Sequence, residues 1–349
     1  MTGSAQQLDG LEPYSYELPR SAVAQRPVYP PDSAKMLVVN RALGSLQHST
    51  FAALGAFLKR GDHLVFNETR VVPARLFGRL PQAPNTEIEL LLIEQQGPTR
   101  WLCMGRPLRK VRASGVVIFG DDLRADIVPS HHNDRVIVEF SSLTPATPVA
   151  ELLYRYGTMP IPLYIRSGHG DEQDRSDYQS IFAKHAGSIA APTASLHFTP
   201  ELINELVDAL GRSVSRVTLH VGTASFQSLF VNGVLRPPPA ERFEVSSETL
   251  ESLHETKARG GRVIAVGTTV TRALEGAARN DTTATQLFIR PGFDFRLIDA
   301  LITNFHQPGT THLLLVEALL GRKLLANCYE SAMNENYRFL SYGDGMIIV

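Results

Sequence analysis

The stretch "RVIAVGTTVTRALEGAAR" (residues 262–279) changes from one hydrophobic pattern to another at Gly267. Its first part is a short apolar run, which is typical of a buried strand, and the remainder reads as a helix. The same alternation continues, with strands expected at 216–222, 262–267, 286–290 and 346–349 and helices at 246–261, 268–279 and 310–321. Strands that alternate with helices predict an α/β domain with a largely parallel sheet.

The pattern between Asp62 and Phe140 differs from this alternation. Runs such as "EIELLLIE" (87–94), "GVVIF" (115–119) and "RVIVEF" (135–140) are strand-like, with Gly, Pro and Asp between them. No helix is expected there, so the stretch predicts a small β-barrel or sandwich. We therefore expect a discontinuous α/β catalytic domain, 1–66 and 146–349, interrupted by a barrel-like domain at 67–145.

Three further helices are expected outside the β-rich stretch. One begins at Ser49 or Thr50 and stops at Gly61, and one begins at Thr147 with Pro148 at its first position. A third starts at Thr199 and ends at Gly211 (199–211).

The composition is that of a soluble globular protein: the chain has 349 residues, 43% hydrophobic and 20% charged, with a formal net charge of −1. Overall charge therefore does not attract nucleic acid, although a local basic patch is still compatible with it. No signal peptide is visible, and the longest apolar stretch, which contains Glu317, is too short to span a bilayer. Two distant cysteines, Cys103 and Cys328, suggest neither a disulfide framework nor a metal site, and we expect a cytoplasmic protein.

Small and polar residues follow several of the expected strands. Gly222 closes one strand, Gly267, Thr268 and Thr269 follow another, and "LITNFHQPGTTH" (301–312) leads into a helix. Ligands collect where the parallel strands of an open sheet end, and N–H groups at a strand-to-helix turn bind carboxylates or oxyanions. An ordinary turn with a threonine cap is the more common origin of such a pattern.

Three histidines, His197, His220 and His306, each end a run of small or apolar residues. A neutral histidine can act as a general base near pH 7, but a lone histidine is more often structural. Their spacing fits no common metal motif, so no metal site is expected. The glycine-rich nucleotide-binding loops and the hydrolase nucleophile motif are absent.

One basic cluster, "GRPLRKVRASG" (105–115), lies in the β-rich stretch and contains no acid. Its cations are Arg106, Arg109, Lys110 and Arg112. They are either a solvated hairpin, as most short charge runs are, or contacts to nucleic-acid phosphates. No aromatic RNA-recognition motif accompanies them.

Taken together, several motifs resemble one family, the S-adenosylmethionine:tRNA ribosyltransferase-isomerases (QueA). They span nearly the whole chain in the family's order: "YSYELPRSAVAQRP", "GDHLVFNETRVVPARLFG", "GTMPIPLYI", "GSIAAPTASLHFT", "VTLHVG", "VIAVGTTVTRALE", "LITNFHQPGTT" and "YRFLSYGDGMII". Each motif alone is weak, whereas their joint occurrence is specific to the family.

The resemblance implies an α/β domain with an inserted β-barrel and one step of queuosine synthesis. The ribosyl unit of S-adenosylmethionine is transferred to 7-aminomethyl-7-deazaguanine at the tRNA wobble position and isomerised to an epoxycyclopentane, with release of adenine and methionine. This implies S-adenosylmethionine as cosubstrate and tRNA as partner, with no metal, other cofactor, membrane or obligate protein partner.

The resemblance also assigns candidate site residues. His197, His306 and, less directly, His220 are the candidates for proton transfer, and Arg106, Arg109, Lys110 and Arg112 for tRNA contact. The candidates for binding the substrate and S-adenosylmethionine are Arg70, Pro192, Thr193, Phe198, Gly222, Gly267, Thr268, Thr269, Arg272, Asn304, Tyr342 and Asp344. In this hypothesis "AAPTASLHF" (190–198) forms one wall of a base-binding slot, with His197 and Phe198 at its edge.

Some positions depart from the family's usual pattern. Ser195 and Ala224 stand where the family has glycine, and Gln307 stands where it has leucine. A lost glycine removes a close backbone approach. Two alternatives therefore stay open: a paralogue that acts on a free deazapurine or another nucleoside, and a non-catalytic RNA-binding descendant.

Overall fold

The structure is a computed structural model that describes residues 14–349 apart from 131, 133, 145, 212, 223–229, 232–233 and 236. The chain forms two compact units. The first, the α/β unit, contains residues up to Arg70, Ser180–Ala186 and Ala191–Val349; the second, the barrel unit, contains Val71–Gln179 and Gly187–Ala190.

The α/β unit is built on a nine-stranded sheet with the order β17-β15-β12-β3-β16-β18-β19-β1-β2. Its strands are β1 Lys35–Asn40, β2 Ser45–Thr50, β3 His63–Asn67, β12 Val214–Leu219, β15 Glu241–Glu244, β16 Val263–Val266, β17 Ala284–Thr285, β18 Ala300–Asn304 and β19 Gly345–Ile348. The central strands β12, β3, β16 and β18 run parallel, as does the pair β1 and β19, and the remaining neighbours are antiparallel. The sheet is thus mixed, with a parallel centre.

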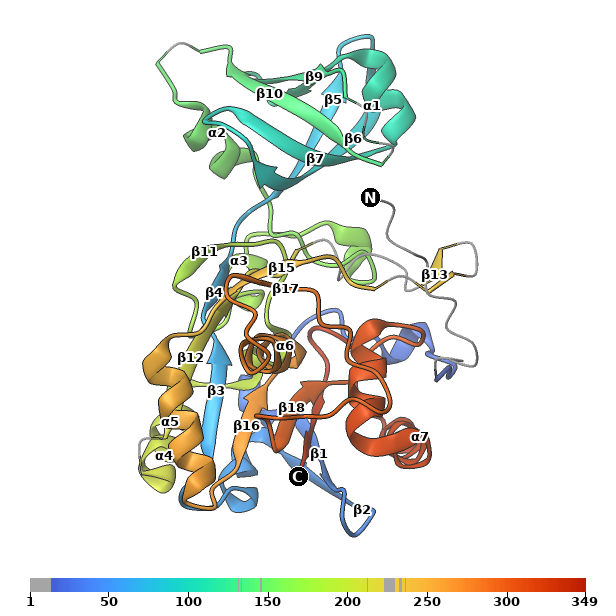
Figure 1. The fold of residues 1–349 in the computed structure, drawn as a ribbon. Coiled ribbons are helices and arrows are strands. Elements are labelled where there is room, and N and C mark those ends of the chain that lie inside the picture. The colour runs from blue at the N-terminus through green and yellow to red at the C-terminus, as the bar shows by residue number, and fades with distance from the viewer. Residues whose placement is uncertain are drawn as a thin grey trace. The chain divides into compact units, whose positions relative to one another are not determined.

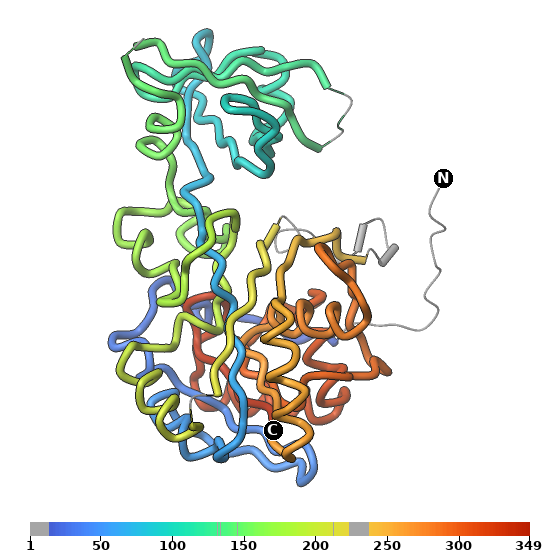
Figure 2. The backbone as a smooth tube through the Cα atoms, turned by 60° about the vertical axis from the view of Figure 1, so that its left-hand side comes forward, coloured from blue at the N-terminus to red at the C-terminus, as the bar shows by residue number. Residues whose placement is uncertain are grey.

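Sequence-distant strands meet in this sheet. β19, in red, pairs with β18 on one side and with β1, in blue, on the other (Figures 1 and 2). All four residues of β19 are buried, as is the central part of β1. The last strand therefore joins the N-terminal strands to the parallel centre.

The main helices of the α/β unit are α4 Pro200–Leu210, α5 Ser247–Ala258, α6 Thr268–Ala277 and α7 Thr311–Asn334. The expected cap of α4 is confirmed, because the Thr199 side chain accepts a hydrogen bond from the N–H of Leu202 and Gly211 ends the helix at a φ of 73°. The helix expected after Ser49 is instead the 3₁₀ helix η3 Phe51–Phe57, and Thr50 makes no side-chain cap there.

The C-terminal region confirms one expectation and corrects another. The strand expected at 286–290 is absent from the described structure, where the shorter β17 Ala284–Thr285 pairs with β15 instead. The expected helix stop at Gly321 is confirmed, because this glycine leaves the helical region with a φ of 72° and a second helical segment, included in α7, continues from it to Asn334. Glycine takes this positive φ without strain, which suits it to the end of a helix.

The barrel unit contains a closed barrel with the order β10-β7-β6-β5-β8-β9 (Figure 1). Its strands are β5 Arg75–Leu80, β6 Ala83–Gln95, β7 Arg100–Arg106, β8 Val116–Phe119, β9 Leu123–Val128 and β10 Val136–Ser142. The helices of the unit are α1 Leu108–Ser114, α2 Val149–Tyr156 and α3 Asp174–Asp177. Shorter pairs in the chain are β4 Thr69–Val71 with β11 His185–Ser188 and β13 Phe230–Val231 with β14 Val234–Leu235. An α/β domain with an inserted barrel is thus confirmed.

Helix α1 was not expected in the β-rich stretch, where the basic cluster suggested a hairpin. Val111 is its buried residue, and Gly115 ends it in the left-handed conformation with a φ of 71°. Helix α2 begins after Pro148 with no side-chain cap, so the expected cap at Thr147 is wrong. Pro148 is itself the N-cap residue rather than the first helical residue, and its side chain has no oxygen that could accept a hydrogen bond.

The barrel unit extends beyond the boundary expected at residue 145. Helix α2 packs on β5, β9 and β10. The segment after it is tied to the barrel by the buried Arg75, whose Nε pairs with Glu89 at 2.9 Å and whose Nη1 donates to the carbonyl of Gly168 at 2.9 Å. The chain up to Gln179 therefore belongs with the barrel.

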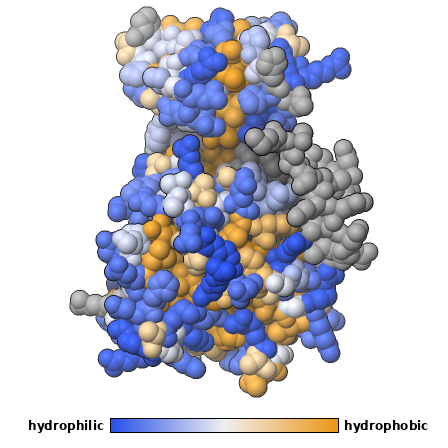
Figure 3. All heavy atoms as spheres, viewed as in Figure 1, coloured by the Kyte–Doolittle hydropathy of each residue, from blue (hydrophilic) through white to orange (hydrophobic). Residues whose placement is uncertain are grey.

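Hydrophilic side chains cover most of the face drawn in Figure 3, with hydrophobic ones between them. Within the described part of the chain, no helix is both long and apolar enough to cross a membrane.

Candidate active site

The four parallel central strands end side by side at one edge of the sheet of the α/β unit. β3 ends at Asn67, β12 at Leu219, β16 at Val266 and β18 at Asn304. Strands β3, β12 and β16 point upward in Figure 1, with α6 beyond the end of β16. The three segments singled out in the sequence therefore lie at a common edge, where ligands bind in open α/β sheets.

Asn67 holds several elements of this edge in place. Its Nδ2 donates to the carbonyl of Leu219 at 3.0 Å and to Thr269 Oγ1 at 3.3 Å. Its Oδ1 accepts from the N–H groups of Leu219 and Thr69, both at 3.1 Å. One buried side chain thus fixes the ends of β3 and β12 and the first turn of α6. The role of Asn67 is not visible in the sequence, because an Asn after an apolar run is also an ordinary turn residue.

The first turn of α6 presents N–H groups at this edge. Its N-cap is Gly267, which has a φ of 99° and makes no side-chain cap. Only glycine adopts this conformation without strain. The turn is therefore a glycine-capped turn and not the threonine-capped turn that the sequence also allowed. The residues that follow, Thr268 and Thr269, therefore sit where helix N–H groups and the helix dipole favour a carboxylate.

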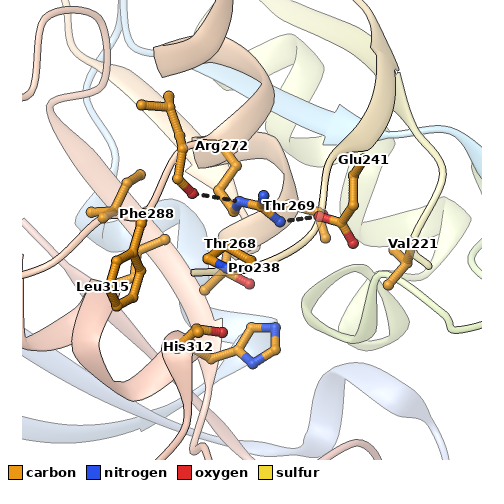
Figure 4. A pocket seen from close by; sticks show the side chains of 12 residues that line it. Val221, Pro238, Glu241, Thr268, Thr269, Arg272, Phe288, His312 and Leu315 are labelled. Carbon is orange, nitrogen blue, oxygen red and sulfur yellow. Dashed lines mark hydrogen bonds and ion pairs between the residues drawn. The ribbon is translucent and has the colours of Figure 1, made fainter. Parts of the chain in front are cut away.

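A pocket opens beside this turn (Figure 4). Thr268, Thr269 and Arg272 reach it from α6, and His312 and Leu315 reach it from α7. Its other lining residues are Val221, Pro238, Glu241, Leu287, Phe288, Ile289 and Thr311. The pocket measures about 20 Å³, enough for a water molecule or one small polar group.

An ion pair between Arg272 and Glu241 forms one wall of the pocket (Figure 4). Both side chains are largely buried, with 12% and 4% exposed. Arg272 Nε also donates to the carbonyl of Leu287 at 3.2 Å, and Glu241 Oε1 accepts from the N–H of Gly222 at 3.3 Å. The pair therefore connects the end of β12 to α6, and Glu241 is a second site residue that the sequence did not reveal.

His312 is the titratable residue that the sequence analysis overlooked. It lies in the first turn of α7 and faces the pocket (Figure 4). Burial, reinforced by the nearby Arg272 cation, lowers the pKa of His312 to about 4. His312 is therefore neutral at pH 7, with an unprotonated ring nitrogen.

His306 lies next to His312, with ring centroids 5.3 Å apart and planes inclined by 23°. The ring Nε2 of His306 is 2.8 Å from Thr303 Oγ1, and the backbone N–H of His306 donates to the Tyr329 hydroxyl at 2.9 Å. Burial, followed by the effect of His312, lowers the pKa of His306 well below its ordinary value. His306 thus does not line the pocket itself but stacks on His312, which does.

His197 belongs to the core. It is 4% exposed and stacks on Phe51, with centroids 4.0 Å apart. Its Nε2 lies 3.3 Å from Asn304 Nδ2, and Asn304 Oδ1 accepts from Thr193 Oγ1 at 3.0 Å. The neighbouring Phe198 is 1% exposed, so it forms part of the core rather than the edge of a base-binding slot. Pro192, also buried, is the N-cap of the 3₁₀ helix η5 Thr193–His197, which contains His197.

Burial makes His197 a determinant of acid stability. Burial, followed by the charge of Arg338, lowers the pKa of His197 from 6.5 to about 3. Below pH 6.5 the unfolded state takes up a proton that the folded state refuses, so stability falls as pH falls toward 3. Between pH 7 and 5 this loss is about 2 kcal/mol. In urea titrations at both pH values, His197→Gln should lose about 2 kcal/mol less than the parent; equal losses contradict this.

The remaining candidates are distributed around the same edge and the core. His220 Nδ1 lies 2.8 Å from Thr69 Oγ1, and Arg70, which follows, is exposed. Tyr342 and Asp344 are buried. Asp344 accepts from the N–H groups of Lys35 at 3.0 Å and Arg338 at 2.7 Å, which is a structural role.

The basic cluster belongs to the barrel unit, whereas the site described above belongs to the α/β unit. Arg106 ends β7, and Arg109, Lys110 and Arg112 lie on α1, all exposed. Arg112 donates to the carbonyls of His132 and, at 3.2 Å, Arg135. Among the described residues, no acid pairs with the other three cations.

Comparison with known proteins identifies the family. The family profile described as "Queuosine biosynthesis protein" matches residues 11–348. The chain belongs to this family. Proteins named "S-adenosylmethionine:tRNA ribosyltransferase-isomerase" from Acaryochloris marina and Magnetococcus marinus are each 41% identical to it. The matches cover 100% of this chain and 96% of the first relative, and 97% and 93% for the second.

A solved structure agrees with this family membership. The S-adenosylmethionine tRNA ribosyltransferase from Thermotoga maritima is 33% identical, with a TM-score of 0.53, and the match covers 96% of this chain and 99% of that one. The family match and the solved relative therefore each extend over both the α/β unit and the barrel unit. Two of the departures, Ser195 and Gln307, lie in the described structure, whereas Ala224 lies outside it.

Proposed function

We propose that this protein is an S-adenosylmethionine:tRNA ribosyltransferase-isomerase. Similarity to relatives of that name over the entire chain carries the proposal. The specific reaction is transfer of the ribosyl unit to 7-aminomethyl-7-deazaguanine at the tRNA wobble position. Isomerisation then gives epoxyqueuosine, and adenine and methionine are released.

The first turn of α6 is suited to the methionine end of S-adenosylmethionine. Thr268 and Thr269 follow the glycine cap with N–H groups and hydroxyls, and the adjacent pocket admits one small polar group. A carboxylate placed there gains hydrogen bonds and a favourable interaction with the helix dipole. Arg272 lies on the same wall, where the carboxylate of Glu241 holds its guanidinium group in place and balances its charge.

The paired histidines are suited to proton transfer. The sulfonium of S-adenosylmethionine acidifies the adjacent ribose carbon, so the reaction needs a neutral base that is placed near it. His312 lines the pocket and is neutral at pH 7, and His306 stacks beside it. We therefore assign proton acceptance to His312, with His306 as its neighbour, and a structural role to His197.

The decisive experiment measures adenine and methionine released from S-adenosylmethionine by the purified protein. Release that requires tRNA carrying the deazaguanine supports the proposal. Release with free 7-aminomethyl-7-deazaguanine instead indicates the paralogue, and no release with either acceptor indicates an RNA-binding descendant.

We also propose that the reaction needs no metal or other cofactor. Among the described residues, no group of three or more His, Cys, Asp or Glu side chains is placed to hold a metal ion. Repeating the release assay after treatment with EDTA tests this part, with the tRNA shown to remain folded. Activity lost to EDTA and restored by zinc or magnesium contradicts it.

The basic cluster is proposed to contact tRNA phosphates. Arg109 and Lys110 are exposed on α1, and neither has an acidic partner among the described residues. Replacing both with Ala should weaken tRNA binding and lower the slope of log affinity against log salt by about 0.7–0.9 for each lost contact.

A matched control separates this effect from a general change in charge. Arg155 is exposed in the same unit, but it pairs with Asp122 at 3.0 Å and Glu151 at 2.9 Å. Arg155→Ala should leave the salt slope unchanged, and S-adenosylmethionine affinity should be the same in both variants. An unchanged slope in the Arg109/Lys110 variant contradicts the proposal and indicates that the cluster is only a solvated face of the helix.

A further inference from the structure

A second polar cavity lies at the opposite edge of the sheet from the candidate active site. It measures about 410 Å³ and lies beside the residues that precede β3 and β16. Its lining residues are Lys59, Arg60, Gly61, Asp62, Leu210, Gly211, Ser213, Thr256, Arg259, Gly260, Gly261 and Arg262. We call this cavity the basic notch; the strands that its residues precede, β3 and β16, begin at their lower ends in Figure 1.

Positive charge dominates the basic notch. In the described part of its lining, four cations stand against the single carboxylate of Asp62. Asp62 is fully engaged, since it accepts from Nε of Arg262 at 3.0 Å and Nη2 at 2.5 Å and from the N–H groups of Lys59 at 2.7 Å and Arg262 at 3.2 Å. Its negative charge is therefore compensated by Arg262, which leaves the other three cations in excess.

Among the described residues, other acids do little to compensate the excess cations. In the described chain, neither Lys59 nor Arg60 forms an ion pair, and both are exposed. Arg259 lies 3.5 Å from Glu255, with 71% and 68% of the two side chains exposed. Such an exposed pair is weak and leaves Arg259 free to bind a stronger anion.

The backbone around the basic notch is closely packed. A Cβ on Gly261 would lie 2.1 Å from the carbonyl oxygen of Gly61, so the two turns touch. Arg262 also donates to the carbonyl of Phe57 at 3.2 Å. The cations therefore project from turns that are already fixed in relation to each other, which lowers the entropy cost of binding.

Buried His63 lies beneath the basic notch and adds no charge to it. Its Nδ1 is 3.1 Å from Thr256 Oγ1, and its Nε2 is 2.8 Å from Ser215 Oγ. Burial, followed by the charge of Arg259, lowers the pKa of His63. Among the described residues, the cations that face the cavity are thus its only positive groups.

We propose that the basic notch is a binding site for a phosphate group. Arginine and lysine together suit a phosphate, because guanidinium groups bind its oxygens in a bidentate manner and ammonium adds a point charge. Asn67, at the far end of β3, lies five residues along the strand from Asp62 in the notch, a distance of about 17 Å at strand rise. The site is therefore distinct from the candidate active site, and its phosphate comes either from the tRNA backbone or from a free phosphate.

The test compares the parent with Arg60→Ala/Arg259→Ala in two arms. In the first, inorganic phosphate is titrated by calorimetry, without S-adenosylmethionine or tRNA, and the Kd should rise at least tenfold in the variant. In the second, tRNA binding is measured against salt. A slope lowered by about 1.4–1.8, two contacts, identifies the tRNA backbone as the source, whereas an unchanged slope with lost phosphate binding identifies free phosphate.

The control removes two exposed cations elsewhere in the α/β unit, Arg296 and Lys323. Arg296→Ala/Lys323→Ala should leave both measurements unchanged. Equal phosphate affinity and equal salt slope in the parent and the Arg60/Arg259 variant overturn the proposal. Because the phosphate titration needs no turnover, its outcome is independent of whether the proposed ribosyl transfer occurs.

Discussion

Replacing His312 with Asn should lower turnover by about 10²- to 10⁴-fold, the usual contribution of a positioned general acid or base. His312 faces the pocket beside the first turn of α6, and its lowered pKa keeps it neutral above about pH 4. Asn retains a polar side chain but cannot accept the proton at neutral pH. The affinity for S-adenosylmethionine should change far less than turnover.

Three other variants make this expectation specific. His306→Asn should also lower turnover, because His306 stacks on His312. His197→Gln should lower stability while the folded fraction keeps its rate, since His197 lies in the core. His254→Asn, on the exposed part of α5, should change neither. Near-normal turnover in His312→Asn removes it from the catalytic list and leaves His306 and His220 as candidates.

The pH profile gives a second readout for His312. Because its pKa is lowered to about 4, the neutral form is present throughout the neutral range and is lost only as pH falls through about 4. The parent should therefore keep its turnover down to about pH 5 in the folded fraction. A fall centred near pH 6.5 would mean that an unperturbed histidine carries the proton transfer.

Glu241→Gln should destabilise the protein by about 3–5 kcal/mol, the cost of leaving a buried charge without its partner. Arg272 and Glu241 are 12% and 4% exposed, so water does little to replace the lost carboxylate. Glutamine keeps an oxygen that can accept from the N–H of Gly222. The free energy of unfolding, measured by urea denaturation, therefore reports the unpaired guanidinium of Arg272.

A double-mutant cycle isolates the pair. Arg272→Met in the Glu241→Gln background should restore much of the lost stability, because no buried charge then remains. The exposed pair Arg155–Glu151, with 50% and 60% exposed, is the control and should show a coupling of at most about 1 kcal/mol. A coupling that small for Arg272 and Glu241 contradicts the structural role assigned to them.

Local sequence signals predicted the elements that local forces determine. Gly267 marks the strand-to-helix turn, because its left-handed φ requires glycine, and Thr199 marks the start of α4 through its hydrogen bond to Leu202. Helix α1 was missed because its seven residues hold one buried apolar side chain, too few for a helical period. The apolar run at 286–290 resembles a strand but forms no ladder, which no local pattern reveals.

The candidate site was only partly visible for a similar reason. Thr268, Thr269 and Arg272 follow the glycine turn directly, so the sequence pointed to them. Glu241 reaches the pocket from β15, and its role depends on its contact with Arg272, which is 31 residues away in the sequence. His312 lies among apolar residues in the first turn of α7, so nothing in the local sequence marks it as a site residue. Only the structure shows that α7 brings it to the pocket.

The position of β19 between β18 and β1 sets an order for folding during synthesis. The barrel strands lie close together in the sequence, so they can pair as soon as the chain up to Gln179 has left the ribosome. The sheet of the α/β unit is different, because β1 is made early but waits for β19 as its neighbour toward the centre. At about 5–20 residues per second the chain between β1 and β19 takes roughly 15–60 s to make. During that interval β1 and β2 form a nascent hairpin whose open edge is exposed to other chains, and this makes the unfinished protein a natural client for chaperones.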